Sequence, residues 1–358
     1  MRILQVCSVT TFGGGERHLS DLSRALVDLG HEIYAASVPD SPLWAELSFL
    51  PKERLLALSR RNHVKNVTGL ARFVRAHDIE IVHAHAARDY HWGALAVKMA
   101  SRSRLVLTRH VLFPLKRVNG PLLSGAGRVI AVSEAVAEVL RQNGVVDASK
   151  ITVVHNGIDV DRFAVADVRE GDVPLLVGTV GHLAPIKGHD VFVRAAALIA
   201  QRREKVKFVI IGEDKSPDMS NRRSLESLIA ELGLNEIVSM PGWRDDMIAA
   251  LSSLTLFVSA ARSEPFGLAI VEAMASALPV VATASEGARE IIEDGVSGKL
   301  VPVDDADALA QAINDLLDNS LECSRLARNA RHAARERFSL ARMASDTERV
   351  YREVLADA

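Results

Sequence analysis

Short apolar runs alternate with amphipathic stretches along most of the chain. In the first half this pattern predicts strands at residues 3–8, 31–37, 79–84, 105–108 and 128–132. It predicts helices at 16–29, 86–100 and 134–142. Apolar strands that alternate with helices indicate a parallel sheet covered on both faces. We therefore expect an α/β fold.

The second half repeats the pattern. Strands are predicted at 175–180, 207–212, 237–240, 254–259 and 279–283, and helices at 188–201, 220–232, 247–252, 268–277, within 305–335 and at 340–355. The polar segment 164–173 lacks periodicity and separates the two series. We expect two doubly wound, Rossmann-like domains at 1–165 and 166–338, with the helix in 339–358 packing back on the first. Ligands of such sheets bind outside the carboxyl ends of the strands, here in a cleft between the domains.

The composition is that of a soluble globular protein: 358 residues, 48% hydrophobic and 25% charged. No run approaches the roughly 18 apolar residues that span a bilayer. The first residues predict a strand that enters a glycine loop rather than a signal peptide. Cys7 and Cys323 are far apart and form no metal-binding spacing. We expect a cytoplasmic protein without disulfides.

Charge is distributed unevenly. Residues 1–165 hold 21 Lys and Arg against 15 Asp and Glu, a net of +6, whereas the remainder holds 22 against 30, a net of −8. The basic side chains gather at Lys52, Arg54, Arg60, Arg61, Lys65, Arg72 and Arg75, then at Arg102, Arg104, Arg109, Lys116 and Arg117. Solvated helix faces explain such charges, and an anionic membrane surface or an acidic acceptor is the alternative. With 4% aromatic residues and no binding module, nucleic acid is not an expected partner.

The segment 263–272 (SEPFGLAIVE) is the most informative motif. Pro265 and Gly267 break regular structure, so Glu264 ends a loop. From Leu268 onward the residues favour helix, which places Glu272 just over one turn into it. A helix N-terminus attracts phosphate, and carboxylates accept hydrogen bonds from sugar hydroxyls. The motif predicts a pocket for a sugar attached to a phosphate.

A second glycine-rich segment follows the first strand. Gly13, Gly14 and Gly15 open the first helix without the spacing of a dinucleotide fingerprint. Either a tight turn or a close approach to a ligand explains them.

Histidines end two strands of the first half, at 82–85 (VHAH) and 108–110 (TRH). We expect His83 and His85 to point to opposite faces of the sheet, which argues against a shared metal ion. His85 and His110 are the site candidates, with structural roles as the alternative.

Lys187 follows the first strand of the second half and stands just before a helix. A cation beside a helix N-terminus pairs with a phosphate that the helix also attracts; a surface lysine is the alternative. Asp159 and Asp161 match the D-x-D pattern of metal-dependent sugar transfer, but they lie in a turn-like segment, which favours a structural role. No phosphate-binding P-loop or nucleophile elbow is present in the sequence.

Together these motifs resemble glycosyltransferase family 4, retaining enzymes of the GT-B fold that use nucleotide sugars. The resemblance runs nearly end to end. It rests on GGGERH, HAH, TRH, VIAVSEAVAEVL, VVHNGIDVDRF, VGHLAPIKGHD, SEPFGLAIVEAMASALPVVAT and GAREIIEDGVSGKLVP.

The resemblance implies a role for each matching residue. Glu264 would contact the donor sugar, Glu272 the ribose and Lys187 the diphosphate. Phe266, Gly267 and Leu268 would hold the phosphate through backbone groups, and Gly14 and Gly15 would approach the donor. His110 or His85 would contact the donor sugar or the acceptor, Ser133 lies at an acceptor-side position, and Gly242 and Trp243 lie near the base.

One residue departs from the family pattern: His182 stands where the family usually has Arg. Because Arg and Lys normally act together on the diphosphate, this change weakens the expected clamp. Arg109 is a candidate for compensation from the acceptor side.

We therefore expect a retaining glycosyltransferase that moves a sugar from a UDP- or GDP-sugar to a glycan or lipid-linked acceptor, in lipopolysaccharide or surface polysaccharide synthesis. No metal and no cofactor are expected, and the enzyme would be cytoplasmic or peripheral on the inner membrane face. A nucleotide-sugar epimerase of the same fold and a non-catalytic sugar-nucleotide-binding protein are the alternatives.

Overall fold

The computed structural model describes residues 1–100, 102–163, 175–244 and 246–357. These residues form two compact units. Unit 1 contains Met1–Gly157 and Leu340–Ala358, and unit 2 contains Ile158–Ser339. The boundary expected at 165/166 falls within 164–174, outside the described residues.

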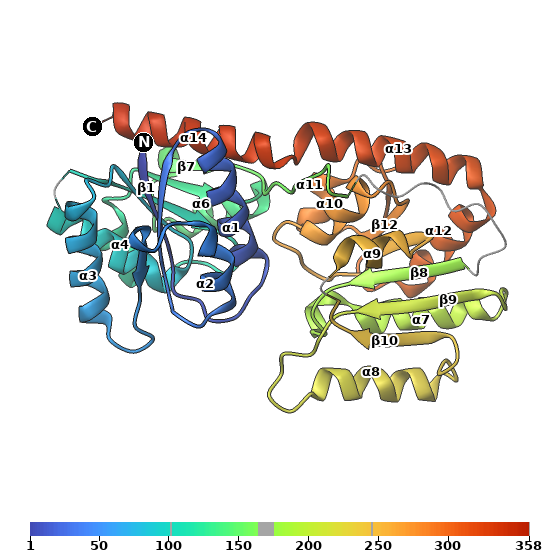
Figure 1. The fold of residues 1–358 in the computed structure, drawn as a ribbon. Coiled ribbons are helices and arrows are strands. Elements are labelled where there is room, and N and C mark those ends of the chain that lie inside the picture. The colour runs from blue at the N-terminus through green and yellow to red at the C-terminus, as the bar shows by residue number, and fades with distance from the viewer. Residues whose placement is uncertain (101, 164–174, 245, 358) are drawn as a thin grey trace. The chain divides into compact units, whose positions relative to one another are not determined.

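Unit 1 is built on a seven-stranded parallel sheet (Figure 1). Its strands, in the order β3-β2-β1-β4-β5-β6-β7, are Leu55–Ala57, Glu32–Ser37, Arg2–Cys7, Ile81–Ala84, Arg104–Arg109, Arg128–Ala131 and Ile151–Val153. Its α-helices are α1 Gly14–Asp28, α2 Pro42–Glu46, α3 His63–Ala76, α4 Ala87–Ala100, α5 Gly120–Leu123, α6 Glu134–Asn143 and α14 Leu340–Ala356.

The last helix of the chain, α14, belongs to unit 1 and packs against α1. Its apolar face contributes Met343, Val350 and Val354 to the same core as Leu19 and Leu22 of α1. Burial of this face follows from the amphipathic pattern of both helices. The helix therefore completes the unit formed by the N-terminal residues.

Unit 2 contains a six-stranded parallel sheet. In the order β10-β9-β8-β11-β12-β13, its strands are Val238–Gly242, Val206–Ile211, Leu175–Val180, Leu256–Ser259, Val280–Thr283 and Lys299–Val301. Its α-helices are α7 His189–Ala200, α8 Ser220–Glu231, α9 Met247–Ser252, α10 Leu268–Ala275, α11 Glu286–Ile291, α12 Ala306–Asp318 and α13 Ser320–Arg337.

In both sheets the strand order reverses beside the first strand. β1 lies between β2 and β4, and β8 lies between β9 and β11. A crevice for ligands forms at the carboxyl ends of the strands at such a reversal. Ligand-binding residues are therefore expected in the loops at these edges. They follow β1, β4 and β5 in unit 1 and β8 and β11 in unit 2.

The pattern-based prediction identified most of the longer elements, but it missed the 14-residue helix α3 and several short elements. Strands β3, β7 and β13 have three residues each, and α11 has six. Elements this short carry too few residues to show a hydrophobic period. None of the helices in the described ranges is long and apolar enough to cross a membrane.

Candidate active site

In unit 2, Lys187 and Glu264 meet at the reversal point of the sheet. Lys187 ends a short 3₁₀ helix, Pro185–Lys187, after β8, and Glu264 lies in the loop after β11. The Lys187 Nζ donates to Glu264 Oε2 at 2.5 Å, across 77 positions of sequence. Both side chains remain partly exposed, at 28% and 16%. The motifs predicted at two separate places therefore form one charged pair.

Arg262 fastens the two loops that carry this pair, and the sequence interpretation missed it. Its guanidinium donates to both carboxylate oxygens of Asp190, at 2.8 and 2.7 Å, and pairs with Asp304 at 2.6 Å. Its backbone N–H donates to the Ile186 carbonyl at 2.8 Å. Hydrogen bonding from Arg262 lowers the pKa of Asp190. The fork geometry of Arg suits this bidentate contact.

Glycines allow these loops to pack backbone against backbone. Gly188 has φ +63°, and a Cβ built there would lie 1.9 Å from the Ala260 carbonyl oxygen. A Cβ at Gly287 would lie 1.9 Å from the Phe266 carbonyl oxygen. The Gly287 N–H donates to the Glu264 carbonyl at 2.8 Å. A larger residue at 188 or 287 would move the Lys187 or Glu264 loop.

The helix α10 begins immediately after the Pro-Phe-Gly turn, as predicted. Gly267 is its N-cap with φ 121°, and Phe266 is buried against Phe338. The first intrahelical donors to the Gly267 carbonyl are Ile270 and Val271. The N–H groups of the preceding helical residues, beginning with Leu268, have no intrahelical acceptor and suit an anion. Glu272 lies further into the helix and is only 4% exposed.

His182 lies half-buried at the same edge, with its ring stacked on Trp243 at a centroid distance of 6.3 Å. Burial, and then the positive charge of Lys215, lower the pKa of His182, so the ring is neutral at pH 7. Trp243 is 47% exposed and follows Gly242, which ends β10 with φ 88°. The Trp243 ring is accessible, and the neutral His182 ring stacked on it adds no positive charge.

In unit 1 the glycine loop and His110 lie together. Gly14 begins α1, and a Cβ built at Gly15 would lie 3.5 Å from the His110 ring. His110 directly follows β5, and Gly13–Gly15 span the end of the loop after β1 and the start of α1. The structure thus brings together two of the segments that the sequence marked separately.

The expectation that His83 and His85 point to opposite faces was wrong. Their ring centroids lie 4.1 Å apart, on one side of the sheet. Side chains in a strand alternate at every residue, so residues two apart share a face. His83 is held on both nitrogens, by Tyr351 Oη and by Thr108 Oγ1, each at 2.6 Å. It is a structural residue of the core.

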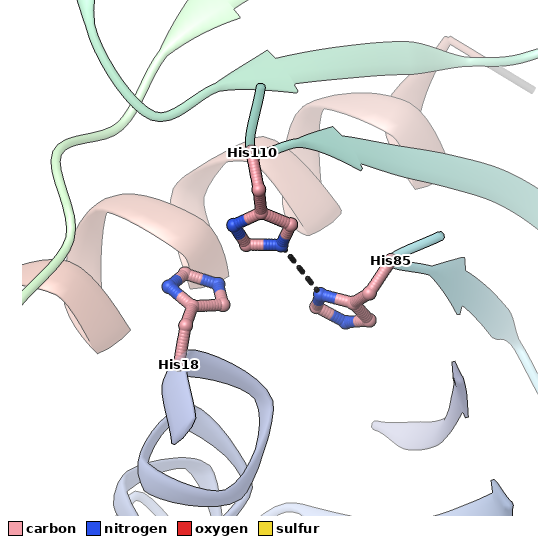
Figure 2. Close-up of side chains that lie close together, drawn as sticks. All are labelled: His18, His85 and His110. Carbon is pink, nitrogen blue, oxygen red and sulfur yellow. Dashed lines mark hydrogen bonds between the residues drawn. The ribbon is translucent and has the colours of Figure 1, made fainter. Parts of the chain in front are cut away.

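His85 and His110 instead meet a third imidazole, that of His18 on α1 (Figure 2). The His110 Nε2 lies 3.5 Å from His85 Nδ1, and the ring centroids of His18 and His110 lie 4.8 Å apart. His18 was not among the predicted site residues. Its signal was its position four residues after Gly14 on the first helix, which puts it on the face above Gly14.

The remaining acceptor-side candidates have internal partners. Ser133 is fully buried and caps α6, where its hydroxyl accepts the Val136 N–H at 3.1 Å. Arg109 is 6% exposed and donates to the Phe113 carbonyl. Asp161 of the D-x-D sequence pairs with Arg335 at 2.8 Å. The structure gives these residues roles in stability, and their contact with a ligand stays a prediction.

The fold and the two sheet edges define an α/β protein with a polar, glycine-rich site at each reversal point. Two family models match adjacent parts of the chain: "Glycosyltransferase Family 4" over residues 12–162 and "Glycosyl transferases group 1" over 163–333. The chain belongs to glycosyltransferase family 4.

Individual proteins agree with this assignment. A D-inositol 3-phosphate glycosyltransferase of Mycobacterium sp. (strain JLS) is 32% identical over 66% of this chain and 59% of that protein. One from Salinispora tropica is 30% identical over 78% of this chain and 64% of its own length. The chain thus spans about three fifths of the curated relatives it matches.

Solved structures confirm the GT-B architecture. A glycosyltransferase from Rickettsia africae ESF-5 has a TM-score of 0.86 and 27% identity, covering 100% of this chain and 99% of that one. Anabaena HepE, in complex with UDP and glucose, has a TM-score of 0.82 and 25% identity over 98% of each chain.

Proposed function

We propose that the protein is a retaining glycosyltransferase that uses a UDP- or GDP-sugar as donor. The observation that carries this proposal is the Lys187–Glu264 pair, held beside the N-terminus of α10 at the reversal point of the unit 2 sheet. A cation, a carboxylate and free backbone N–H groups match a sugar diphosphate in charge and hydrogen bonding. The complex of HepE with UDP and glucose supports the same ligand class.

In the free protein Lys187 and Glu264 neutralise each other. Binding of the donor would exchange partners: the diphosphate takes the Lys187 ammonium, and a sugar hydroxyl donates to the Glu264 carboxylate. Arg262 keeps both loops in place during this exchange, because it bonds backbone and side-chain groups on the Lys187 side. Glu272 would accept hydrogen bonds from the ribose, and Trp243 with Gly242 would lie near the base.

The proposed reaction develops negative charge on the leaving nucleoside diphosphate as the bond to the sugar breaks. Lys187 and the first N–H groups of α10, including that of Leu268, stabilise this charge. Each such donor contributes on the order of 3 kcal/mol to the transition state. The leaving phosphate accepts the acceptor's proton on the same face of the sugar, which retains the anomeric configuration. This scheme needs neither a metal ion nor a separate protein base.

Unit 1 would supply the acceptor side, with His85, His110, Arg109 and Ser133 at or near its edge and Gly14 and Gly15 approaching the donor. A glycan or lipid-linked acceptor of lipopolysaccharide or surface polysaccharide synthesis is the proposed class. The surface of unit 1 supports a lipid-linked acceptor and a cytoplasmic enzyme peripheral on the inner membrane face, because Lys65, Arg72 and Arg75 project from α3 into solvent. Phe113, which is 72% exposed and close in sequence to Lys116 and Arg117, adds an apolar side chain to the support for membrane contact.

The first test is nucleotide binding followed by transfer. Isothermal titration with UDP and GDP, in buffer containing a chelator, should give binding to one of them. The protein should then transfer labelled sugar from the matching donor to a membrane extract. Glu264→Ala should abolish transfer, whereas Glu293→Ala, which removes an exposed carboxylate of the same unit, should leave it unchanged. No binding of either nucleotide would refute the proposal.

A second function, sugar-nucleotide binding without turnover, is favoured by one observation. A neutral His182 adds no charge to the diphosphate site, so stabilisation of the leaving group is weaker than with Arg. His182→Arg should tighten UDP or GDP binding on the order of 10-fold, as expected for one charge-assisted hydrogen bond. Nucleotide binding by the wild type with no transfer from any donor would favour this second function.

A further inference from the structure

Three imidazoles converge at the carboxyl edge of the unit 1 sheet. His18 comes from α1, His85 follows β4 and His110 follows β5. One ring nitrogen from each lies within 4.8 Å of those of the other two (Figure 2). His18 and His85 are 3% and 5% exposed, and His110 is intermediate, so one side of the group is open to solvent.

A neighbouring amide sets the tautomer of His85. The Gln5 Oε1 lies 2.7 Å from His85 Nε2, and because an amide oxygen only accepts, that nitrogen carries the proton. The lone pair of His85 is therefore on Nδ1, which faces His110 Nε2 at 3.5 Å. Gln5 thus orients the ring in the way that outer partners orient metal-binding histidines.

His18 has unsatisfied hydrogen-bonding capacity. Within the described residues neither of its ring nitrogens has a hydrogen-bond partner of good geometry, although both are buried. The side chain of Asn156 lies against the ring without making a hydrogen bond of good geometry to it. Buried polar atoms without partners are uncommon because they cost free energy. Two buried ring nitrogens without a well-formed hydrogen bond leave His18 able to coordinate a cation.

We propose that His18, His85 and His110 form a binding site for one divalent transition-metal ion of the zinc class. A zinc–nitrogen distance of about 2.0–2.1 Å implies nitrogens about 3.3 Å apart in a tetrahedral site. The pair at 3.5 Å already fits, and the widest pair, at up to 4.8 Å, would close by about 1.5 Å through ring rotation.

The chemistry of the donors selects the metal. Three imidazoles and no carboxylate favour Zn²⁺, Co²⁺, Ni²⁺ or Cu²⁺ over Mg²⁺ and Ca²⁺, which prefer oxygen. The partial exposure of His110 would let water reach a fourth position on the ion. The positive charge of Arg109 is close enough to His110 to repel a bound cation, which limits the affinity of the site for the metal ion. His83 is not a ligand, because both of its nitrogens are occupied.

The metal site shares His85 and His110 with the proposed acceptor side, whereas stabilisation of the leaving group uses unit 2 residues and needs no metal. An ion bound here would occupy the lone pair of His110 and so compete with any contact between His110 and a sugar. Binding itself does not depend on the proposed function, so it is measured without substrates.

The test uses untagged full-length protein that has been freed of metal with a chelator. Titration with Co²⁺ should produce the visible absorption of a nitrogen-coordinated ion, saturating at one ion per chain, and Zn²⁺ should displace it. His18→Gln, His85→Gln and His110→Gln should each weaken binding by more than the roughly 10- to 100-fold that loss of an outer partner costs. Gln5→Leu should fall within that range. The control His332→Gln, which removes an exposed imidazole on α13, should bind as the wild type does.

Circular dichroism and thermal unfolding of each variant without metal establish whether it is folded. If His85→Gln loses its fold because of its bond to Gln5, the other two histidine variants still decide the question. Failure of the wild type to bind Co²⁺ and Zn²⁺ at one ion per chain would overturn the proposal. Unchanged affinity in folded His18→Gln and His110→Gln would overturn it as well.

Discussion

The two units share a parallel sheet whose strand order reverses beside its first strand, but they place different chemistry at that point. In unit 1 the edge gathers the imidazoles His18, His85 and His110. In unit 2 it gathers the opposite charges of Lys187 and Glu264. The same topology therefore positions candidate ligand-binding groups in both units without determining which groups they are.

Burial explains why the chemistry differs. Desolvation penalises charge, so the enclosed edge of unit 1 holds neutral rings, and burial lowers the pKa of both His85 and His110. At the more open edge of unit 2, Lys187 and Glu264 stay partly exposed and paired. A buried cluster of neutral nitrogen donors suits a transition-metal cation, whereas a paired, accessible charge suits an anionic ligand that exchanges with its partner.

The largest expected effect tests the charged edge. Lys187→Ala should lower the rate of sugar transfer by about 10²- to 10³-fold, because the leaving diphosphate loses a preorganised positive charge. Steady-state kinetics with a saturating donor measures this. Lys207→Ala, which removes an exposed lysine from β9 of the same unit, is the matched control and should not change the rate. Equal losses in the two variants would contradict a specific role for Lys187.

The close backbone packing of unit 2 predicts a loss of stability. Gly188→Ala should destabilise the protein by on the order of 3 kcal/mol more than Gly233→Ala. Both glycines have a left-handed backbone, at φ +63° and +69°. A Cβ added at Gly188 would lie 1.9 Å from the Ala260 carbonyl oxygen, whereas a Cβ added at Gly233 would meet open space. Denaturant unfolding compares the two variants. Equal losses in the two variants would mean that the left-handed backbone alone, and not the contact with Ala260, sets the loss of stability.

Acid should weaken unit 2 through a buried histidine. His189 is 3% exposed, and burial lowers its pKa to about 4 from an ordinary value near 6.5. The folded state disfavours the protonated ring. The contribution of His189 to the free energy of unfolding is therefore fully present above pH 6.5 and is lost as the pH falls towards 4. The wild type should lose on the order of 3 kcal/mol relative to His189→Gln over this interval. Parallel pH profiles of the two proteins would contradict this.

In unit 1, Asp89 should make the stability depend on pH in the opposite direction. Burial raises the pKa of Asp89 to about 6, although Ser8 donates to its carboxylate from its backbone N–H at 2.8 Å and from its hydroxyl. The folded state therefore holds the proton more tightly, and the wild type should lose stability relative to Asp89→Asn as the pH rises from 4 to 6. We expect about 2–3 kcal/mol in denaturant unfolding. A difference that grows on acidification would show that hydrogen bonds from Ser8 outweigh burial.

The smallest effect concerns the pair that fastens the unit 2 loops. Asp190→Asn should cost only about 0.5–1 kcal/mol of stability, because both partners are partly exposed and screened by water. It should raise KM for the donor more than it lowers kcat, since the Lys187 loop would be held less firmly. Asp218→Asn, at the exposed ion pair with Arg223, controls for loss of surface charge. A kcat loss without a change in KM would mean that Asp190 acts on the reaction step itself.

Particular elements show how far the sequence predicts the fold. The strand predicted at 175–180 agrees with β8, Leu175–Val180, and the helix expected from Leu268 begins there. Such elements are encoded locally, by apolar runs and by breakers such as Pro265 and Gly267. The three-residue strands β3, β7 and β13 were missed because their pairing with β2, β6 and β12, not their own pattern, makes them strands.

The candidate site was predictable where a motif carries its own geometry. The placement of Glu264 before a helix and of Lys187 before another follows from residues within ten positions of each. Arg262 was missed because its partner Asp190 lies 72 positions away, and no local pattern joins them. His18 was missed because its position four residues after Gly14 indicates only a shared helix face, and its approach to His85 and His110 joins segments far apart in the sequence.

The sequence by itself determined the alternating α/β pattern, the family motifs and the positions of Glu264, Lys187 and the glycine loop at strand ends. Only the tertiary structure decided that Lys187 meets Glu264, that Arg262 holds their loops, and that His85 and His110 share an edge with His18. The physical reason is that periodicity and turn residues act over a few positions of the chain. Contacts at a sheet edge depend instead on strand order, which is set by the packing of the whole unit.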